Sequence, residues 1–150
     1  MGIPVIFMLT SVITLTIDMW QYDNLAFATQ ATARYVAMHG RNCIQDGSSC
    51  TLTVADVVSY LSARGIALDN GKANVTLQST TASTVCNPLS ICAGNTAQFP
   101  VASDNGVNFD VTVKVTYPVT NPFAMFWPGV GSVAFRPVNL YAVSRQRIVF

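Results

Sequence analysis

The first forty residues contain one long segment without a helix breaker, and this segment restricts the fold more than any other feature of the chain. No glycine or proline stands between Pro4 and Gly40. Apolar residues recur at helical spacing through its second half, and a glycine such as Gly40 often follows a helix C-terminus. We therefore predict one helix from Ile3 to His39, about 55 Å long at 1.5 Å per residue.

The start of this helix is strongly apolar. Residues 3–17 read IPVIFMLTSVITLTI and contain no charge. Their Thr and Ser hydroxyls can donate hydrogen bonds to helix carbonyls. Fifteen residues match the core of a signal peptide and are fewer than the about 20 of a membrane span. No basic segment precedes them and no small-residue cleavage site follows, so we predict a membrane-type helix, not a cleaved signal.

Three polar or aromatic residues follow the apolar run. Trp20 and Tyr22 stand where the aromatic belt at a membrane surface would lie, but ordinary core packing explains them equally well. Asp18 either lies at the membrane interface or pairs with a basic group of a neighbouring chain. Beyond Asp18 the helix is predicted to be amphipathic.

The four cysteines form two pairs in the sequence, Cys43 with Cys50 and Cys86 with Cys92. Zinc sites usually have closer pairs and additional ligands, and His39 is the only histidine. Two local disulfides are therefore favoured over a metal site, although four cysteines allow three connectivities. Disulfides indicate an oxidising compartment.

The second part of the chain predicts a short helix followed by strands. Thr53-Val-Ala-Asp56 is typical of a capped helix start, and Gly65 closes that helix. The apolar period then changes to two, which predicts strands at 73–79 and 107–117 and a last strand pair within 133–149. The predicted class is α+β, with the long N-terminal helix packed on an antiparallel sheet.

Two loops complete this prediction. The segment 79–104 is expected to be a surface excursion between two strands. The loop 118–128 carries Phe123, Phe126 and Trp127 in an uncharged region. These aromatic side chains either fold over the core or form a contact patch for another subunit.

Composition and motifs argue against several functions. Charged residues make up only 10% of the chain and the net charge is +1, so no broad basic surface for nucleic acid is expected. One histidine and scattered aspartates form no catalytic or metal-binding motif, so we predict neither an enzyme nor a cofactor. Asn74-Val-Thr76 fits the acceptor pattern for N-glycosylation, a triplet that also occurs by chance.

Three segments, taken in order, carry a family resemblance. The first is the long helix, an apolar run entered through Pro4, with Asp18 near its end, that closes in ARYVAMHG at 33–40. The second is the strand 111–118, which ends in Tyr-Pro before an aromatic loop. The third is Leu-Tyr-Ala-Val-Ser at 140–144. In this order they resemble the TadE/TadG-like pseudopilins of tight-adherence (Tad) pili, a branch of the type IV pilus-like systems.

One feature departs from the family. Its members usually have a Gly cleavage site followed by Glu at the fifth mature position, whereas this chain contains no Glu. Cleavage after Gly2 would place Phe7 at that position. Either the given sequence lacks its true N-terminus, which would also lengthen the apolar run to a full span, or the processing differs.

The resemblance implies a pilin-like fold and a structural role in an extracellular, pilus-like filament at the cell surface, reached via the inner membrane. Residues 1–40 would be the assembly helix and 41–150 a disulfide-stapled globular α+β domain. The expected partners are further copies in a helical homopolymer, the inner membrane before assembly, and other pilins.

Two alternatives remain: a minor pseudopilin that primes or tips a Tad pilus, and a membrane-anchored adhesion or binding module. The expected assembly residues are Ile3, Pro4, Ile6, Phe7, Leu9, Ile13, Ile17, Asp18, Trp20 and Tyr22.

Overall fold

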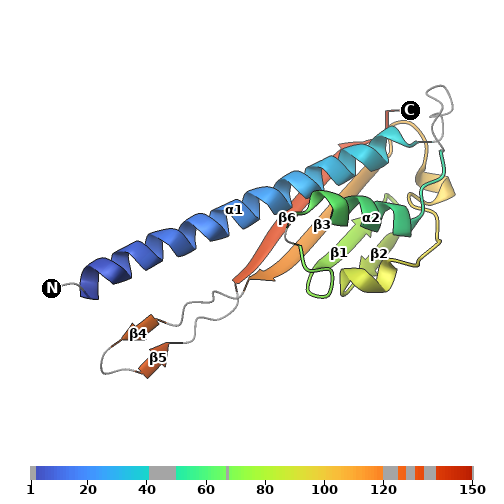
Figure 1. Cartoon of the computed structure of the whole chain (residues 1–150). Helices are drawn as coiled ribbons and strands as arrows, with labels where there is room; N and C mark the ends of the chain where they lie inside the picture. Colours follow the sequence, from blue (N-terminus) through green and yellow to red (C-terminus); the bar gives the residue numbers. More distant parts are fainter. Residues whose placement is uncertain are drawn as a thin grey trace.

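The computed structural model describes residues 3–40, 50–66, 68–119, 125–127, 131–133 and 138–149. The chain has an α+β fold with a long N-terminal helix, a short second helix and a four-stranded antiparallel sheet (Figure 1). The helices are α1 (Ile3–Met38) and α2 (Val54–Arg64), with two short 3₁₀ helices, η2 (Leu89–Cys92) and η3 (Ala102–Asp104). The strands are β1 (Asn74–Gln78), β2 (Ser83–Cys86), β3 (Asp110–Val119), β4 (Met125–Trp127), β5 (Gly131–Val133) and β6 (Val138–Arg147).

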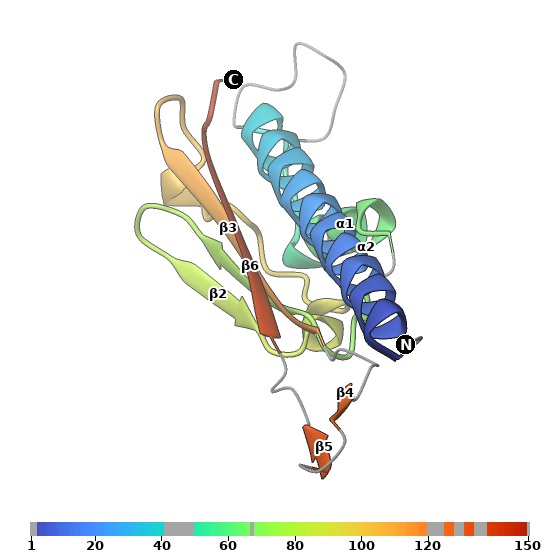
Figure 2. The same cartoon turned by 90° about the vertical axis from the view of Figure 1, so that its left-hand side faces the viewer.

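The main sheet has the strand order β2-β1-β3-β6, and every neighbouring pair is antiparallel. Both helices cover the same face of this sheet, as Figure 2 shows along the direction of α1. The opposite face is not covered by either helix. Strands β4 and β5 pair with each other and form a separate two-stranded hairpin.

The second half of α1 packs on the sheet, mainly against β3 and β6. Its buried residues are small or branched, which allows the helix to approach the strands closely: Leu25, Ala28, Ala33, Val36 and Ala37. The buried hydroxyls of Thr29 and Thr32 donate to the carbonyls of Leu25 and Ala28 at 2.7 Å, so neither hydroxyl is buried without a partner. The predicted single helix is confirmed.

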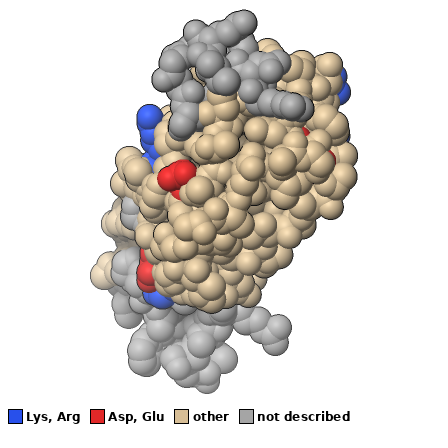
Figure 3. All heavy atoms as spheres, turned by 90° about the vertical axis from the view of Figure 1, so that its right-hand side faces the viewer, with Lys and Arg blue, Asp and Glu red and all other residues tan. Residues whose placement is uncertain are grey.

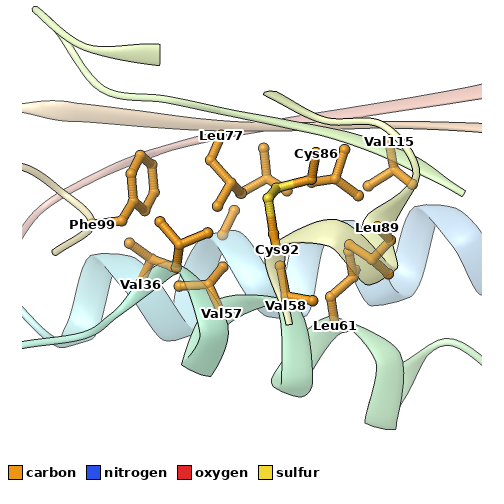
Figure 4. Packing of buried hydrophobic residues seen from close by; sticks show 14 of the residues in the cluster. Val36, Val57, Val58, Leu61, Leu77, Cys86, Leu89, Cys92, Phe99 and Val115 are labelled. Atoms are coloured by element: carbon orange, nitrogen blue, oxygen red, sulfur yellow. A yellow bond between two sulfur atoms is a disulfide. The ribbon is translucent and has the colours of Figure 1, made fainter. Parts of the chain in front are cut away.

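The core lies between the sheet and the two helices (Figure 4). On β3 the predicted alternation is confirmed by Val111, Val113 and Val115, which are fully buried. Leu77 on β1 and Val36 on α1 reach the same cluster from opposite sides. Period-two burial on the strands and helical spacing on α1 therefore produce one continuous apolar layer.

Helix α2 begins and ends as the sequence predicts. The Thr53 hydroxyl accepts a hydrogen bond from the Asp56 amide at 3.2 Å, and the Asp56 carboxylate accepts one from the Thr53 amide at 2.9 Å. Hydrogen bonds from Thr53 hold the pKa of Asp56 below its ordinary value. Gly65 follows the last residue of the helix. The apolar residues of one helix face are buried in the core: Val54, Val57, Val58 and Leu61.

An aromatic stack joins the two helices. The rings of Tyr35 on α1 and Tyr60 on α2 lie parallel, with centroids 4.1 Å apart, and His39 lies 4.3 Å from Tyr35 on the other side. The Arg64 guanidinium lies 5.2 Å above the Tyr60 ring. Burial raises the pKa of the Tyr35 hydroxyl, and the nearby Asp56 carboxylate raises it further.

Two predictions about the strands are wrong in detail. The strand predicted at 107–117 begins only at Asp110, because Asn108 has a φ of 74° and turns the chain before the strand. It then continues through Pro118 to Val119, which lie in the predicted loop 118–128. The strand pair predicted within 133–149 is also wrong, since β6 pairs with β3 and β5 pairs with β4.

The segment 79–104 is more than the predicted surface excursion. It contributes strand β2 and the helix η2 to the fold, and Leu89 and Phe99 are buried in the core. The predicted disulfide between Cys86 and Cys92 is confirmed, and both residues are buried. Cys50 is also disulfide-bonded. Its predicted partner, Cys43, lies outside the described residues, so that pairing stays a prediction.

Candidate assembly surface

The first half of α1 extends beyond the sheet that covers the second half (Figure 1). The large apolar side chains that the structure describes in this half are between 43% and 75% exposed. They are Val5, Ile6, Met8, Leu9, Val12, Ile13, Leu15, Ile17 and Met19. We call these nine residues the apolar helix surface. Its size is unusual, because monomeric proteins rarely expose large contiguous apolar patches.

Three threonines in the same half are made less polar by their own hydrogen bonds. Thr10, Thr14 and Thr16 each donate the side-chain hydroxyl to the backbone carbonyl four residues earlier, at 3.0, 2.8 and 2.8 Å. A hydroxyl that is already bonded within its own helix can enter an apolar contact at little cost. The bonded threonine hydroxyls therefore interrupt the apolar character of this half of the helix only slightly.

The apolar helix surface is wide. At 3.6 residues per turn its nine residues spread over roughly 200° of the helix circumference. A helix that faces a single core needs an apolar stripe only about 100° wide. One partner helix or one groove would therefore leave much of this surface in water. Complete burial requires apolar neighbours on at least two sides.

The structure places four of the ten predicted assembly residues on this surface. Ile6, Leu9, Ile13 and Ile17 are exposed members of it, and Trp20 and Tyr22 follow with 49% and 46% exposure. Half-exposed Trp20 and Tyr22 are not core residues of the isolated chain. Asp18 is half-buried and makes an interaction within the structure. Ile3, Pro4 and Phe7 lie in α1, but their side chains are outside the described part of the chain.

Sequence reasoning missed some residues of this region. Val5, Met8, Val12, Leu15 and Met19 belong to the surface, although the apolar run alone did not single them out. Phe27 was also missed: it is 59% exposed on the side of α1 turned away from the sheet. Its helical position, seven residues after Trp20, continues the exposed side of the helix.

The predicted contact loop is described only in part. Phe126 and Trp127 belong to β4, whose side chains lie outside the described residues, and Phe123 is itself outside them. The β4–β5 hairpin stands apart from the four-stranded sheet, at the end of the molecule toward which the N-terminus of α1 points (Figures 1 and 2). An isolated two-stranded hairpin is only marginally stable in water, so a contact would stabilise it. The predicted contact of this loop with another subunit stays a prediction.

The end of the molecule opposite the N-terminus of α1 has few charges. Figure 3, which views the molecule from the end opposite the N-terminus of α1, shows isolated charged side chains on a largely uncharged surface. Within the described ranges, no group of three or more His, Cys, Asp or Glu side chains could hold a metal ion. In the same ranges no helix has an apolar stretch long enough to span a membrane, so the predicted transmembrane helix is not found.

Comparisons of this chain with protein-family models, with curated proteins and with solved structures found no match.

Proposed function

We propose that this chain is a structural subunit of an extracellular, pilus-like filament, of the kind formed by TadE/TadG-like pseudopilins. Copies of the chain would assemble through the apolar helix surface. The observation that carries the proposal is the contrast within α1: its second half is buried against the sheet, whereas nine large apolar side chains of its first half are exposed. This division supports a pilin-like reading of the α+β fold.

The width of the apolar helix surface favours a polymer over a dimer. In a two-fold dimer each helix would contact one partner and cover only part of the roughly 200° apolar arc. In a helical filament each subunit uses different patches to contact several neighbours, and the contacts do not close. Each helix then has apolar neighbours on several sides, which is the environment that its side chains require.

Burial of the apolar helix surface contributes a large free energy to assembly for so short a segment. Full burial of an Ile, Leu, Val or Met side chain is favourable by roughly 1.5–3 kcal/mol, so covering the exposed half of each contributes about 1 kcal/mol. Asp18 is the only charged residue among the first twenty-two. Desolvation of charge therefore opposes little of this gain.

The inner membrane is the proposed environment of the same side chains before assembly, and other pilins are proposed as further partners. Placement on the outside of the cell fits the disulfide between Cys86 and Cys92, since disulfides persist in oxidising compartments. We propose no catalytic role and no cofactor.

The test is the composition of filaments sheared from cells that produce the chain. Mass spectrometry of purified filaments is expected to identify this chain as a major component. A filament that contains it only in traces would reject the major-subunit proposal and support the minor pseudopilin. Cells that expose the chain without any filament would support the adhesion module instead.

A further inference from the structure

The face of the sheet opposite α1 carries a polar groove of about 470 Å³. Strands β1, β3 and β6 and the turn after β1 contribute its lining, which includes Gln78, Thr80, Asp110, Thr112, Lys114 and Arg145. This volume lies within the range of small-ligand sites. Hydroxyl, amide and charged groups dominate the lining, in contrast to the apolar face that covers the core.

The strand register fixes which of these side chains are neighbours. On the outer face Arg145 of β6 lies opposite Thr112 of β3, and Lys114 of β3 lies between Thr76 of β1 and Val143 of β6. Directly opposed side chains in an antiparallel sheet are about 5 Å apart at Cβ, and diagonal neighbours about 7–8 Å. Lys114 and Arg145 are diagonal neighbours, so one small ligand can reach both.

The charges of this region are not balanced. The Asp110 carboxylate binds the Arg145 guanidinium at 2.6 Å and that of Arg147 at 3.5 Å. The hydrogen bond from Arg145 holds the pKa of Asp110 below its ordinary value, despite a smaller opposing effect of desolvation. Lys114 has no ion-pair partner within the part of the chain that the structure describes. Three cations therefore face one carboxylate, and the local charge is positive.

We propose that this groove binds an acidic polysaccharide, with Lys114 taking the carboxylate of a uronic acid unit. The amide of Gln78 and the hydroxyls of Thr80 and Thr112 are placed to exchange hydrogen bonds with sugar hydroxyls. A cation that is not already paired loses no internal contact when an anionic ligand arrives, and a charge-assisted hydrogen bond is stronger than a neutral one.

The groove fits nucleic acid less well. Binding to a phosphate backbone usually relies on several Lys and Arg contacts, and single strands also stack their bases on aromatic side chains. Here Arg145 is already paired with Asp110, and no aromatic side chain is among the described residues that line the groove. Lys114, the one cation without an ion-pair partner among the described residues of the groove, lies among hydroxyl and amide groups and suits a sugar acid better.

The position of the groove on an assembled filament rests on the proposed function. If the apolar helix surfaces meet in the filament core, the sheet face opposite α1 points outward (Figure 2). The groove would then repeat along the filament, and many weak sites on one fibre give a high overall affinity. The groove itself belongs to a single subunit and can be tested without assembly.

The experiment uses the full chain, solubilised in mild detergent, and titrates it with tetragalacturonate in a calorimeter. Maltotetraose serves as the neutral probe of equal length, and a short oligothymidylate as the nucleic-acid probe. Lys114→Gln is expected to weaken tetragalacturonate binding about tenfold, because it removes one hydrogen bond to a charged group. Lys114→Arg retains the charge and should restore most of the affinity.

The matched control is Lys72→Gln, which removes an exposed lysine that pairs with Asp69 away from the groove. It should change the affinity less than about twofold, as is usual for surface charges. Unchanged binding by Lys114→Gln, equal binding of maltotetraose, tighter binding of oligothymidylate, or no binding at all would each overturn the inference. Filaments without groove binding would refute only this inference, whereas groove binding without filaments would refute only the proposed function.

Discussion

The Asp104 carboxylate accepts a 2.7 Å hydrogen bond from the hydroxyl of Ser79, which lies 25 residues earlier in the chain. The same oxygen accepts hydrogen bonds from the amide of Thr81 at 2.6 Å and from its hydroxyl at 2.8 Å. Asp104 is only 1% exposed. These hydrogen bonds join helix η3 to the turn between β1 and β2. They also replace the hydrogen bonds to water that the Asp104 carboxylate loses on burial.

Replacement of Asp104 by Asn should lower the free energy of unfolding by about 2 kcal/mol, because the hydrogen bonds that Ser79 and Thr81 donate to a buried charged oxygen would become weaker, neutral ones. Urea denaturation of the full chain in mild detergent measures this loss. The matched control is Asp69→Asn, an exposed site where the amide oxygen can still accept the 2.9 Å hydrogen bond from the Gly71 amide. An equal effect of the two substitutions would contradict the role of Asp104.

The same contact makes stability depend on pH. Burial acts to raise the pKa of Asp104, but the hydrogen bonds from Ser79 and Thr81 outweigh it and hold the pKa below the ordinary value of 3.8. A carboxyl whose pKa is lowered by folding contributes stability above its ordinary pKa, and this contribution is lost as the pH falls through the lowered value. We therefore expect the free energy of unfolding to fall more steeply with decreasing pH, below about pH 3.8, in the wild type than in Asp104→Asn. If the free energies of unfolding of the two proteins changed in parallel with pH, Asp104 would not be the cause of the pH dependence.

The disulfide between Cys86 and Cys92 should be important for stability. Its replacement by two alanines is expected to lower the free energy of unfolding by about 2 kcal/mol or more, measured by urea denaturation without reductant.

Trypsin, which cleaves after Lys and Arg, leaves each predicted cysteine pair within one peptide, 42–64 or 73–114. Peptide mapping without reductant should therefore show two internally linked peptides, and a bond joining them to each other would contradict the predicted connectivity.

The assembly surface can be tested with two exposed isoleucines, Ile13 and Ile91. Ile13→Lys places a charge on the apolar helix surface and should abolish filament formation, because burying an unpaired ammonium is very costly. The matched control is Ile91→Lys, at a residue of η2 that is 69% exposed on the globular part of the chain. Filaments counted by electron microscopy should persist with Ile91→Lys. Loss of filaments in both variants, or in neither, would contradict the assigned surface.

The extent of the long helix and the core faces could be predicted because both depend on local pattern. The absence of breakers between Pro4 and Gly40 and the alternation at Val111, Val113 and Val115 are visible without knowledge of the fold. The start of β3 was misplaced because the left-handed turn at Asn108 interrupts a pattern that alternates across it.

The remaining features depend on contacts between distant residues. The segment 79–104 looked like a surface loop because its polar composition hides the few buried residues, such as Leu89 and Phe99. The hydrogen bonds of Asp104 and the groove around Lys114 can be recognised only when the strand register is known, and the sequence pattern does not reveal that register. For the same reason, the apolar run predicted that α1 has an assembly surface, but not how much of its circumference that surface covers.

Helical reconstruction of the purified filament tests the central claim most directly. We predict that the first half of α1 from each subunit lies in the filament core, with Leu9 and Ile13 in contact with helices of at least two neighbouring subunits and the β1–β3–β6 face turned outward. A filament in which these side chains remain exposed to solvent, and the subunits meet through the sheet instead, would contradict it.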